Sequence, residues 1–292
     1  SGLEPLRPFQ DVGQLIDQSS KIFSSLSPYF GEMFDTMRQK NLDLDSRKGK
    51  GPGGFCDFFN QSGEAYIFMN AVGTQDDIQT LFHEGGHAFH ALESHKHQKL
   101  IWNYHGPMEF NEVASMGMEM LAMPYLEQSK GGMYTALDAK RARSDHLFDA
   151  AVVFLPYMAC VDAFQHWLYV DAPEDVGIAT INAKWAELYS SFLPHLDFSG
   201  IEDGMAFRWQ RQSHIFTSPF YYIEYGIAQV GALQVWQNAL ENETMAVQKY
   251  RQALQMGGTK GLKELFETAG LTLRFDSSHL ASLMQLVEAA LE

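Results

Sequence analysis

Apolar residues recur at helical spacing along most of the 292-residue chain, and they follow the shorter period of strands in only one region. The first helical stretch breaks near Ser27-Pro28, and Gly257-Gly258 and Gly270 punctuate the last stretch. Helices are predicted within residues 10–40 (two helices) and over 75–94, 107–126, 134–170, 173–193, 219–240, 243–256, 259–269 and 277–291, with 194–217 irregular. The pattern therefore indicates a mainly α fold.

The region with strand character consists of residues 55–59 and 65–69, two short runs rich in aromatic and aliphatic side chains. A charged, glycine-rich loop is expected before them, over residues 41–54. The second run leads almost directly into the helix predicted at residue 75. We therefore expect a small β-hairpin or sheet beside that helix, where a strand could pair with an extended peptide.

The helix predicted from residue 75 carries the main chemical signal of the chain. Thr74 can cap it, with Asp77 in the reciprocal position. His83 and His87 are four residues apart and share a face, so both imidazoles can bind one metal ion. Glu84 projects beside that face, where it can reach a metal-bound water. This HExxH pattern is typical of zinc peptidases.

Gly85 and Gly86 lie in the middle of the same helix. Each glycine costs about 1 kcal/mol relative to alanine in a helix interior. We expect close approach of another backbone to be the reason for them.

A catalytic zinc requires a third protein ligand and one open position. His90 lies one turn beyond His87, but three imidazoles in one helical row do not converge tetrahedrally, so His90 is expected in the second shell or the core. Glu112 lies on the next predicted helix among apolar residues, and a buried carboxylate requires a cation. The residues alone leave two readings of Glu112, a metal ligand or a structural carboxylate.

Three ordered blocks of sequence carry a more specific signal. The first runs from Gly73 to Asp77 and from Leu81 to His90, the second from Phe110 to Ser115, and the third from Trp209 to His214 and from Pro219 to Ala228. Together they resemble the thimet oligopeptidase/oligoendopeptidase F family of zinc metallopeptidases, peptidase family M3. The resemblance covers residues from about 45 to about 240.

The resemblance implies a zincin-type, multi-helix catalytic domain that holds one zinc ion through His83, His87 and Glu112. Gly85 departs from the family, which usually has a larger apolar residue there. Family members also have an N-terminal helical region, and their substrate channel lies between two lobes. Residues 1–292 are therefore interpreted as a single catalytic domain, the C-terminal portion of a longer parent chain.

The resemblance also suggests roles for residues around the zinc. Glu84 would be the general base, and Tyr222 and Tyr225 would stabilise the tetrahedral intermediate with help from His214. Tyr221 is assigned to the core. Glu119 lies two turns after Glu112 on one face and could orient a ligating histidine, or it could be a surface carboxylate.

Composition narrows the possible partners. Apolar residues make up 46% of the chain and the net charge is −15, which indicates a globular protein and argues against nucleic acid as a partner. Two cysteines are too few for a disulfide framework and favour a reducing, cytoplasmic location. No uninterrupted apolar run reaches the length of a membrane span and no signal peptide opens the chain, so no membrane partner is expected.

These observations predict a zinc-dependent endopeptidase that hydrolyses peptide bonds in short oligopeptides. Two alternatives stay open. One is a zinc hydrolase of another class, such as an aminopeptidase, which would require an acidic pocket for the free amine. The other is a zinc-binding module whose catalysis is impaired because the N-terminal lobe, a possible partner, is absent.

Overall fold

The computed structural model describes residues 4–292 and begins with two antiparallel helices. They are α1 (Val12–Leu26) and α2 (Pro28–Met37). Ser27 between them is extended, with φ −161° and ψ 129°, because a residue that precedes proline disfavours the helical conformation. The two predicted helices and the break at Ser27-Pro28 are confirmed.

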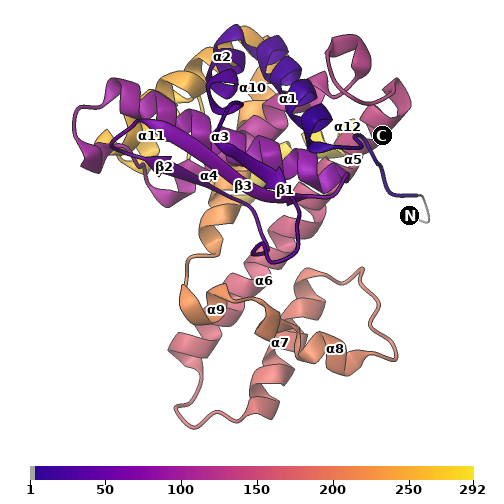
Figure 1. Ribbon diagram of the computed structural model, residues 1–292. Coiled ribbons are helices and arrows are strands. Elements are labelled where there is room, and N and C mark those ends of the chain that lie inside the picture. Colours follow the sequence, from indigo (N-terminus) through magenta and orange to yellow (C-terminus); the bar gives the residue numbers. More distant parts are fainter. Residues whose placement is uncertain (1–3) are drawn as a thin grey trace.

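A three-stranded sheet follows, in the order β1-β3-β2. Strand β2 (Phe55–Phe59) pairs antiparallel with β3 (Glu64–Ala71), which confirms the predicted hairpin. Strand β1 (Leu42–Asp45) pairs parallel with β3, so the prediction of a loop over residues 41–54 was wrong at its start. The four residues of β1 are too few to show a period. Strand β2 lies at an edge of the sheet, and Figure 1 shows the sheet lying across α3 (Gln75–His97).

Helices α3 (Gln75–His97) and α4 (Met108–Ala122) confirm the two helices predicted around the metal-binding motif. The turn from β3 into α3 is fixed by Asp77, whose Oδ2 accepts the backbone N–H groups of three successive residues. The donors are Val72 at 2.9 Å, Gly73 at 2.8 Å and Thr74 at 2.7 Å. A carboxylate at the start of a helix also interacts favourably with the helix dipole.

Different neighbours account for the two glycines in α3. A Cβ on Gly86 would lie 2.6 Å from the Cα of Ser115, so the backbones of α3 and α4 touch there, as expected. A Cβ on Gly85 would instead lie 3.1 Å from the ring of the fully buried Phe23 in α1. The expected backbone contact is therefore confirmed for Gly86, whereas an aromatic ring occupies the space at Gly85.

Helix α10 (Ile223–Met256) completes the main body and packs along α4, with a kink at Asn242, where φ is −156°. A Cβ on Gly231 would lie 2.7 Å from Val113, so these helices are also closely packed. Further elements of this body are α11 (Leu262–Thr268), α12 (Ser277–Leu291), η1 (Ile101–Asn103), η2 (Met123–Tyr125), η3 (Gln128–Lys130) and η7 (Gly257–Thr259). One large hydrophobic cluster joins the sheet to these helices.

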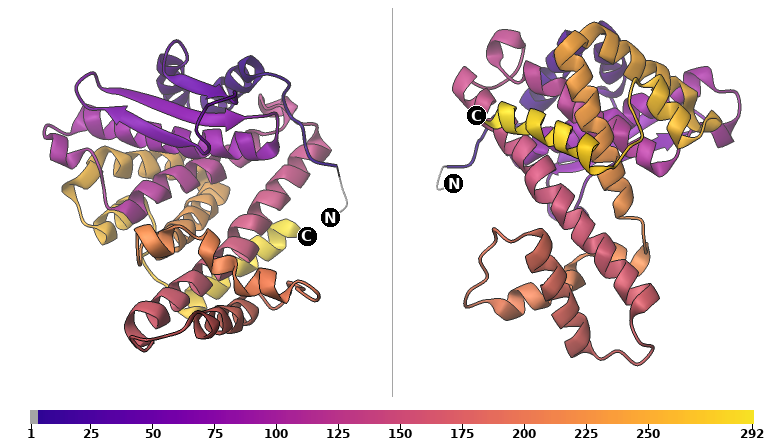
Figure 2. Two further views of the ribbon diagram at one scale, coloured as in Figure 1. Left: turned by 60° about the horizontal axis from the view of Figure 1, so that its bottom comes forward. Right: turned by 180° about the vertical axis from the view of Figure 1, so that it is seen from behind.

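A smaller unit with its own hydrophobic cluster projects below this body in Figures 1 and 2. A helical run over residues 136–171 leads into it, and short helices return the chain to α10. The first part of this run, α5 (Ala136–Leu147) and η4 (Phe148–Phe154), still packs into the core of the main body. The elements of the smaller unit are α6 (Leu155–His166), η5 (Trp167–Asp171), α7 (Ile178–Phe192), α8 (Glu202–Ala206), η6 (Arg208–Arg211) and α9 (His214–Thr217). The prediction of a mainly α fold with one small sheet is confirmed.

The helical run over residues 136–171 has the length and hydropathy of a membrane span, and 39% of its most apolar window is buried. Asp149 and Asp162 interrupt its apolar sequence. In the structure α6 packs against α7 and α10, and core helices of folded proteins meet the same criteria. The absence of a membrane partner stays a prediction.

Candidate metal centre

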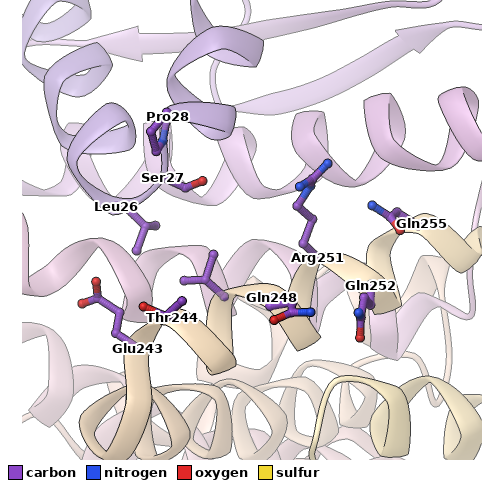
Figure 3. A pocket seen from close by; sticks show the side chains of 10 residues that line it. Leu26, Ser27, Pro28, Glu243, Thr244, Gln248, Arg251, Gln252 and Gln255 are labelled. Atoms are coloured by element: carbon purple, nitrogen blue, oxygen red, sulfur yellow. The ribbon is translucent and has the colours of Figure 1, made fainter.

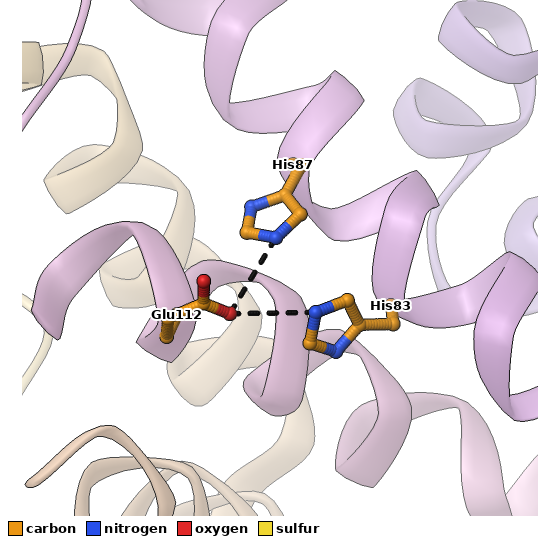
Figure 4. Close-up of side chains that lie close together, drawn as sticks. All are labelled: His83, His87 and Glu112. Atoms are coloured by element: carbon orange, nitrogen blue, oxygen red, sulfur yellow. Dashed lines mark ion pairs between the residues drawn. The ribbon is translucent and has the colours of Figure 1, made fainter. Parts of the chain in front are cut away.

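Three side chains from two helices meet at one point (Figure 4). His83 and His87 come from α3, and Glu112 comes from α4. Glu112 Oε2 lies 3.3 Å from His83 Nε2 and 3.5 Å from His87 Nε2. One ligand atom from each residue lies within 4.8 Å of the other two, so the cluster could hold a metal ion.

The spacing of these atoms fits one small ion. Ligand atoms about 2.0–2.1 Å from a tetrahedral zinc stand about 3.3 Å apart. The two distances from Glu112 Oε2, 3.3 and 3.5 Å, match that separation. Two nitrogens and one carboxylate oxygen also form a donor set found at catalytic zinc, with one position left for water. The residues present therefore fit the expected metal.

The electrostatics of the cluster favour an anionic Glu112. Burial raises the pKa of this carboxyl, but hydrogen bonds from His83 and His87 outweigh burial and hold the pKa well below its usual range. Burial likewise lowers the pKa of His83, and its contacts with Glu112 and Glu119 raise it well above the usual value. Glu112 Oε2 also accepts a 2.9 Å hydrogen bond from Ser115 Oγ.

Glu119 contacts the far side of the His83 ring. Its Oε1 lies 2.7 Å from His83 Nδ1, which leaves Nε2 facing Glu112. Such a contact fixes the tautomer and orientation of a ligating imidazole. The contact expected between Glu119 and one of the histidines is therefore present, and Glu119 is not a surface carboxylate.

Glu84 is 6% exposed and lies at the wall of a cavity of about 350 Å³ that His83 and Glu119 also line. Burial raises its pKa, and the charges of His83 and His87 oppose that rise. A Cβ on Gly54 would lie 3.5 Å from Glu84 Oε1 and 2.8 Å from the methyl of Thr80. The start of strand β2 therefore runs directly beside this carboxyl, a contact that no sequence signal indicated.

His90 lies outside the three-residue cluster. It is 4% exposed, burial lowers its pKa to about 3, and its Nε2 has no hydrogen-bond partner among the described residues. It lines a second cavity, of about 270 Å³, together with His87 and Glu112. The two cavities thus lie on opposite flanks of the histidine pair.

The aromatic residues predicted for the site gather at the start of α10. The His214 ring lies 5.1 Å from the ring of Tyr222 and 5.9 Å from that of Tyr225. Tyr222 is 8% exposed and packs in the smaller hydrophobic cluster, against Phe154 and Tyr157. Tyr222 therefore faces this cluster with most of its ring.

Tyr221, which the sequence assigned to the core, is only partly buried, so that assignment was wrong. Its ring stacks 5.8 Å from His214, and its hydroxyl hydrogen-bonds with that of Tyr225. Burial raises the pKa of Tyr221 and of Tyr225, and the charge of Glu112 adds to both shifts. The charge of Glu112 therefore reaches both hydroxyls, and they stay protonated at neutral pH.

A larger cavity, of about 530 Å³, lies apart from this centre (Figure 3). It is formed between the α1–α2 junction and the second half of α10. Arg251 on its wall donates a 2.6 Å hydrogen bond to the fully buried Glu93. None of the residues predicted for the chemistry lines this cavity, so the metal centre is the better candidate site.

Two histidines on one helix, a carboxylate from a second helix and a buried glutamate beside them form the arrangement of single-metal hydrolases. The sequence model of Peptidase family M3 matches residues 29–285, and the chain belongs to this family. The resemblance stated from the sequence is confirmed.

Individual relatives agree with this assignment. The chain is 24% identical over 265 residues to oligoendopeptidase F, plasmid, of Lactococcus lactis subsp. cremoris, covering 89% of this chain and 42% of that protein. It is 23% identical to oligopeptidase PepF of Bacillus subtilis (strain 168), covering 84% of this chain and 36% of that protein. The chain thus spans less than half the length of these relatives.

A solved structure of PZ peptidase A with an inhibitor superimposes on the chain with a TM-score of 0.88 at 34% identity. The match covers 99% of this chain and 50% of that one. The likeness therefore extends over the fold as a whole, including both the main body and the smaller unit.

Proposed function

We propose that the chain is the catalytic portion of a zinc-dependent endopeptidase that hydrolyses short peptides. The observation that carries this proposal is the meeting of His83, His87 and Glu112 at the spacing of a tetrahedral zinc site. Membership of Peptidase family M3 supports peptide bonds as the target. Relatives named oligoendopeptidase and oligopeptidase support short peptides as substrates.

The proposed roles follow from the positions of the side chains. When bound by His83, His87 and Glu112, zinc would supply a Lewis acid and a water of lowered pKa. Glu84 accepts the proton of the attacking water on a carboxylate oxygen and then delivers it to the leaving amine. Its raised pKa makes it a stronger base than an exposed carboxylate.

A hydroxyl donor is also required where negative charge develops on the substrate carbonyl oxygen. Tyr225 is the first candidate, because the charge of Glu112 reaches it and because it keeps its proton at neutral pH. Tyr222 is the second candidate, and its burial predicts a smaller contribution. His214, whose Nδ1 lies 2.7 Å from Gln212 Nε2, packs against both rings and supports them.

The space around the centre favours an endopeptidase over an aminopeptidase. Cavities of about 350 and 270 Å³ flank the histidine pair, so a peptide can extend on both sides of the scissile bond. Strand β2 at the sheet edge lies above them, and an extended peptide can add to such an edge through its backbone. An aminopeptidase would have one flank closed behind the amine.

A specific observation also supports the alternative of an impaired zinc-binding module. The chain covers 42% of the relative from Lactococcus, so part of the substrate channel could come from a further lobe. In that case the chain would bind zinc normally but cleave peptides slowly.

The deciding experiment measures cleavage of internally quenched fluorescent peptides by this chain, with a chelator and after zinc is restored. Glu84→Gln is the matched variant, because it keeps the three ligands and removes the base. We expect cleavage to require zinc, and the variant to lose about 10³-fold in kcat at unchanged zinc content. Chelator-resistant cleavage would exclude the zinc mechanism, and zinc binding without cleavage would favour the impaired module.

A further inference from the structure

His146 is a further neighbour of Glu119, the carboxylate that contacts His83. It is in the last turn of α5, it is 7% exposed, and its Nε2 lies 3.4 Å from Glu119 Oε2. The other oxygen of the same carboxylate, Oε1, lies 2.7 Å from His83 Nδ1. The Glu119 carboxylate thus lies between two imidazoles, one from α3 and one from α5. It is hydrogen-bonded to His83, whereas the buried His146 Nε2 lies 3.4 Å from it and has no hydrogen-bond partner among the described residues.

The surroundings give Glu119 few other partners. His83 and His146 are its ion-pair partners among the described residues. The small cavity between Glu119 and His146 is walled by apolar side chains such as Phe82 and Leu126, and by the amides of Gln75 and Gln79. Within residues 4–292, no lysine or arginine lines this cavity. His146 is therefore the nearest group that can stop this carboxylate from turning away from His83.

We propose that His146 is a positioning residue for the metal centre. It holds Glu119 in the orientation in which Oε1 accepts the His83 Nδ1–H, and this contact leaves His83 Nε2 free to bind the ion. The inference rests on the proposed zinc site and extends it to a third helix. Its physical basis is the 10–100-fold loss of metal affinity that typically follows removal of groups that orient metal ligands.

A pair of variants of nearly equal size tests this role. His146→Gln keeps an N–H donor, whereas His146→Met removes it. We expect His146→Met to raise the zinc dissociation constant about 10-fold and His146→Gln to raise it less than about 3-fold. Competition with a chromophoric chelator measures the constant, and thermal unfolding of the metal-free proteins reports any loss of stability separately.

A double-mutant cycle separates positioning from packing. In a Glu119→Ala background, His146→Met should change zinc affinity less than about 2-fold, because the carboxylate it orients is gone. A packing role would give the same loss in both backgrounds. In the zinc-loaded wild type, NMR should also show a His83 Nδ1–H that exchanges slowly with solvent, and this exchange should quicken in His146→Met.

The outcomes distinguish the two proposals. If the wild type binds zinc and cleaves peptides but His146→Met matches it in affinity and exchange, the inference alone is overturned. Equal losses for Gln and Met, or additive losses in the cycle, would overturn it too. If the wild type binds no zinc, the proposed function fails and the positioning role fails with it.

Discussion

The two halves of the candidate site are held in different ways. His83, His87 and Glu112 stand on regular helices whose backbones touch at Gly86, and each side chain has a defined polar neighbour. Tyr221 and Tyr225 stand at the start of α10, after irregular chain, and are held mainly by aromatic rings. Phe220, next to Tyr221, has the left-handed φ of 64° that side chains rarely adopt.

This difference indicates that the two halves of the candidate site have different roles. Closely packed helices fix the ligand atoms to within the small tolerance that a metal ion requires. We infer that aromatic packing around irregular backbone constrains the tyrosine hydroxyls less tightly than the helices constrain the ligand atoms. We therefore expect substitutions in the helical half to affect metal binding and stability, and substitutions in the aromatic half to affect turnover.

The largest effect is expected for Glu112→Ala, which removes a ligand and leaves two imidazoles. Zinc affinity should fall more than about 100-fold, since loss of groups that only orient ligands already costs 10–100-fold. Chelator competition measures the constant. Glu109→Ala, one turn earlier on α4, is the control and should bind zinc normally. An unchanged affinity in Glu112→Ala would place the third ligand elsewhere.

Tyr225→Phe comes next and tests the aromatic half. Removing a hydroxyl that donates to the developing oxyanion should lower kcat by about 10²-fold while zinc affinity stays constant. Tyr222→Phe is compared with it under the same conditions, and its burial predicts a smaller loss. A normal rate in Tyr225→Phe, with a large loss in Tyr222→Phe, would exchange the two assignments.

Gly86→Ala tests the contact between α3 and α4. The added methyl would meet the backbone of Ser115, so the helices must move apart, and we expect about 2 kcal/mol lower stability despite the better helix propensity of alanine. Denaturant unfolding of the metal-free chain measures it. Gly51→Ala is the control, because open space surrounds that glycine. Equal stability of the two variants would contradict the close contact.

The smallest effect is expected for Gln165→Met, which acts on the backbone before the tyrosines. Gln165 is fully buried, and its Oε1 accepts a 2.8 Å hydrogen bond from the Phe220 N–H. Removing the acceptor should lower stability by about 1 kcal/mol and kcat only a few-fold. An effect as large as that of Tyr225→Phe would mean that this strained turn sets the position of the tyrosines rigidly.

The sequence predicted the helical half well because its signals are local. The spacing of His83 and His87 on a helix places both on one face whatever the rest of the fold does. Helical periodicity likewise located α3 and α4, and the family resemblance selected Glu112 between its two readings. Each of these predictions depends on regular backbone, for which position in sequence determines direction in space.

The parts that the sequence missed depend on contacts between distant segments. Strand β1 is too short to show a period, and it forms because β3 offers it a partner edge. His146 lies beside Glu119 because the fold brings together α5 and α4, and no spacing in the sequence indicates this contact. Tyr221 was assigned to the core because three tyrosines at helical spacing do not reveal which hydroxyl turns toward the metal centre.

The turn from β3 into α3 fixes the position of the sheet relative to α3. Asp77 ties three successive backbone groups there, so the sheet cannot slide along the helix that carries both histidines. A peptide that pairs with β2 would be held through its backbone. Its distance from the metal centre would therefore be set by the main chain of the sheet and of the peptide, and not by the peptide's side chains. On the proposed function, the scaffold would then accept many peptide sequences, and any preference among them would come from the flanking cavities.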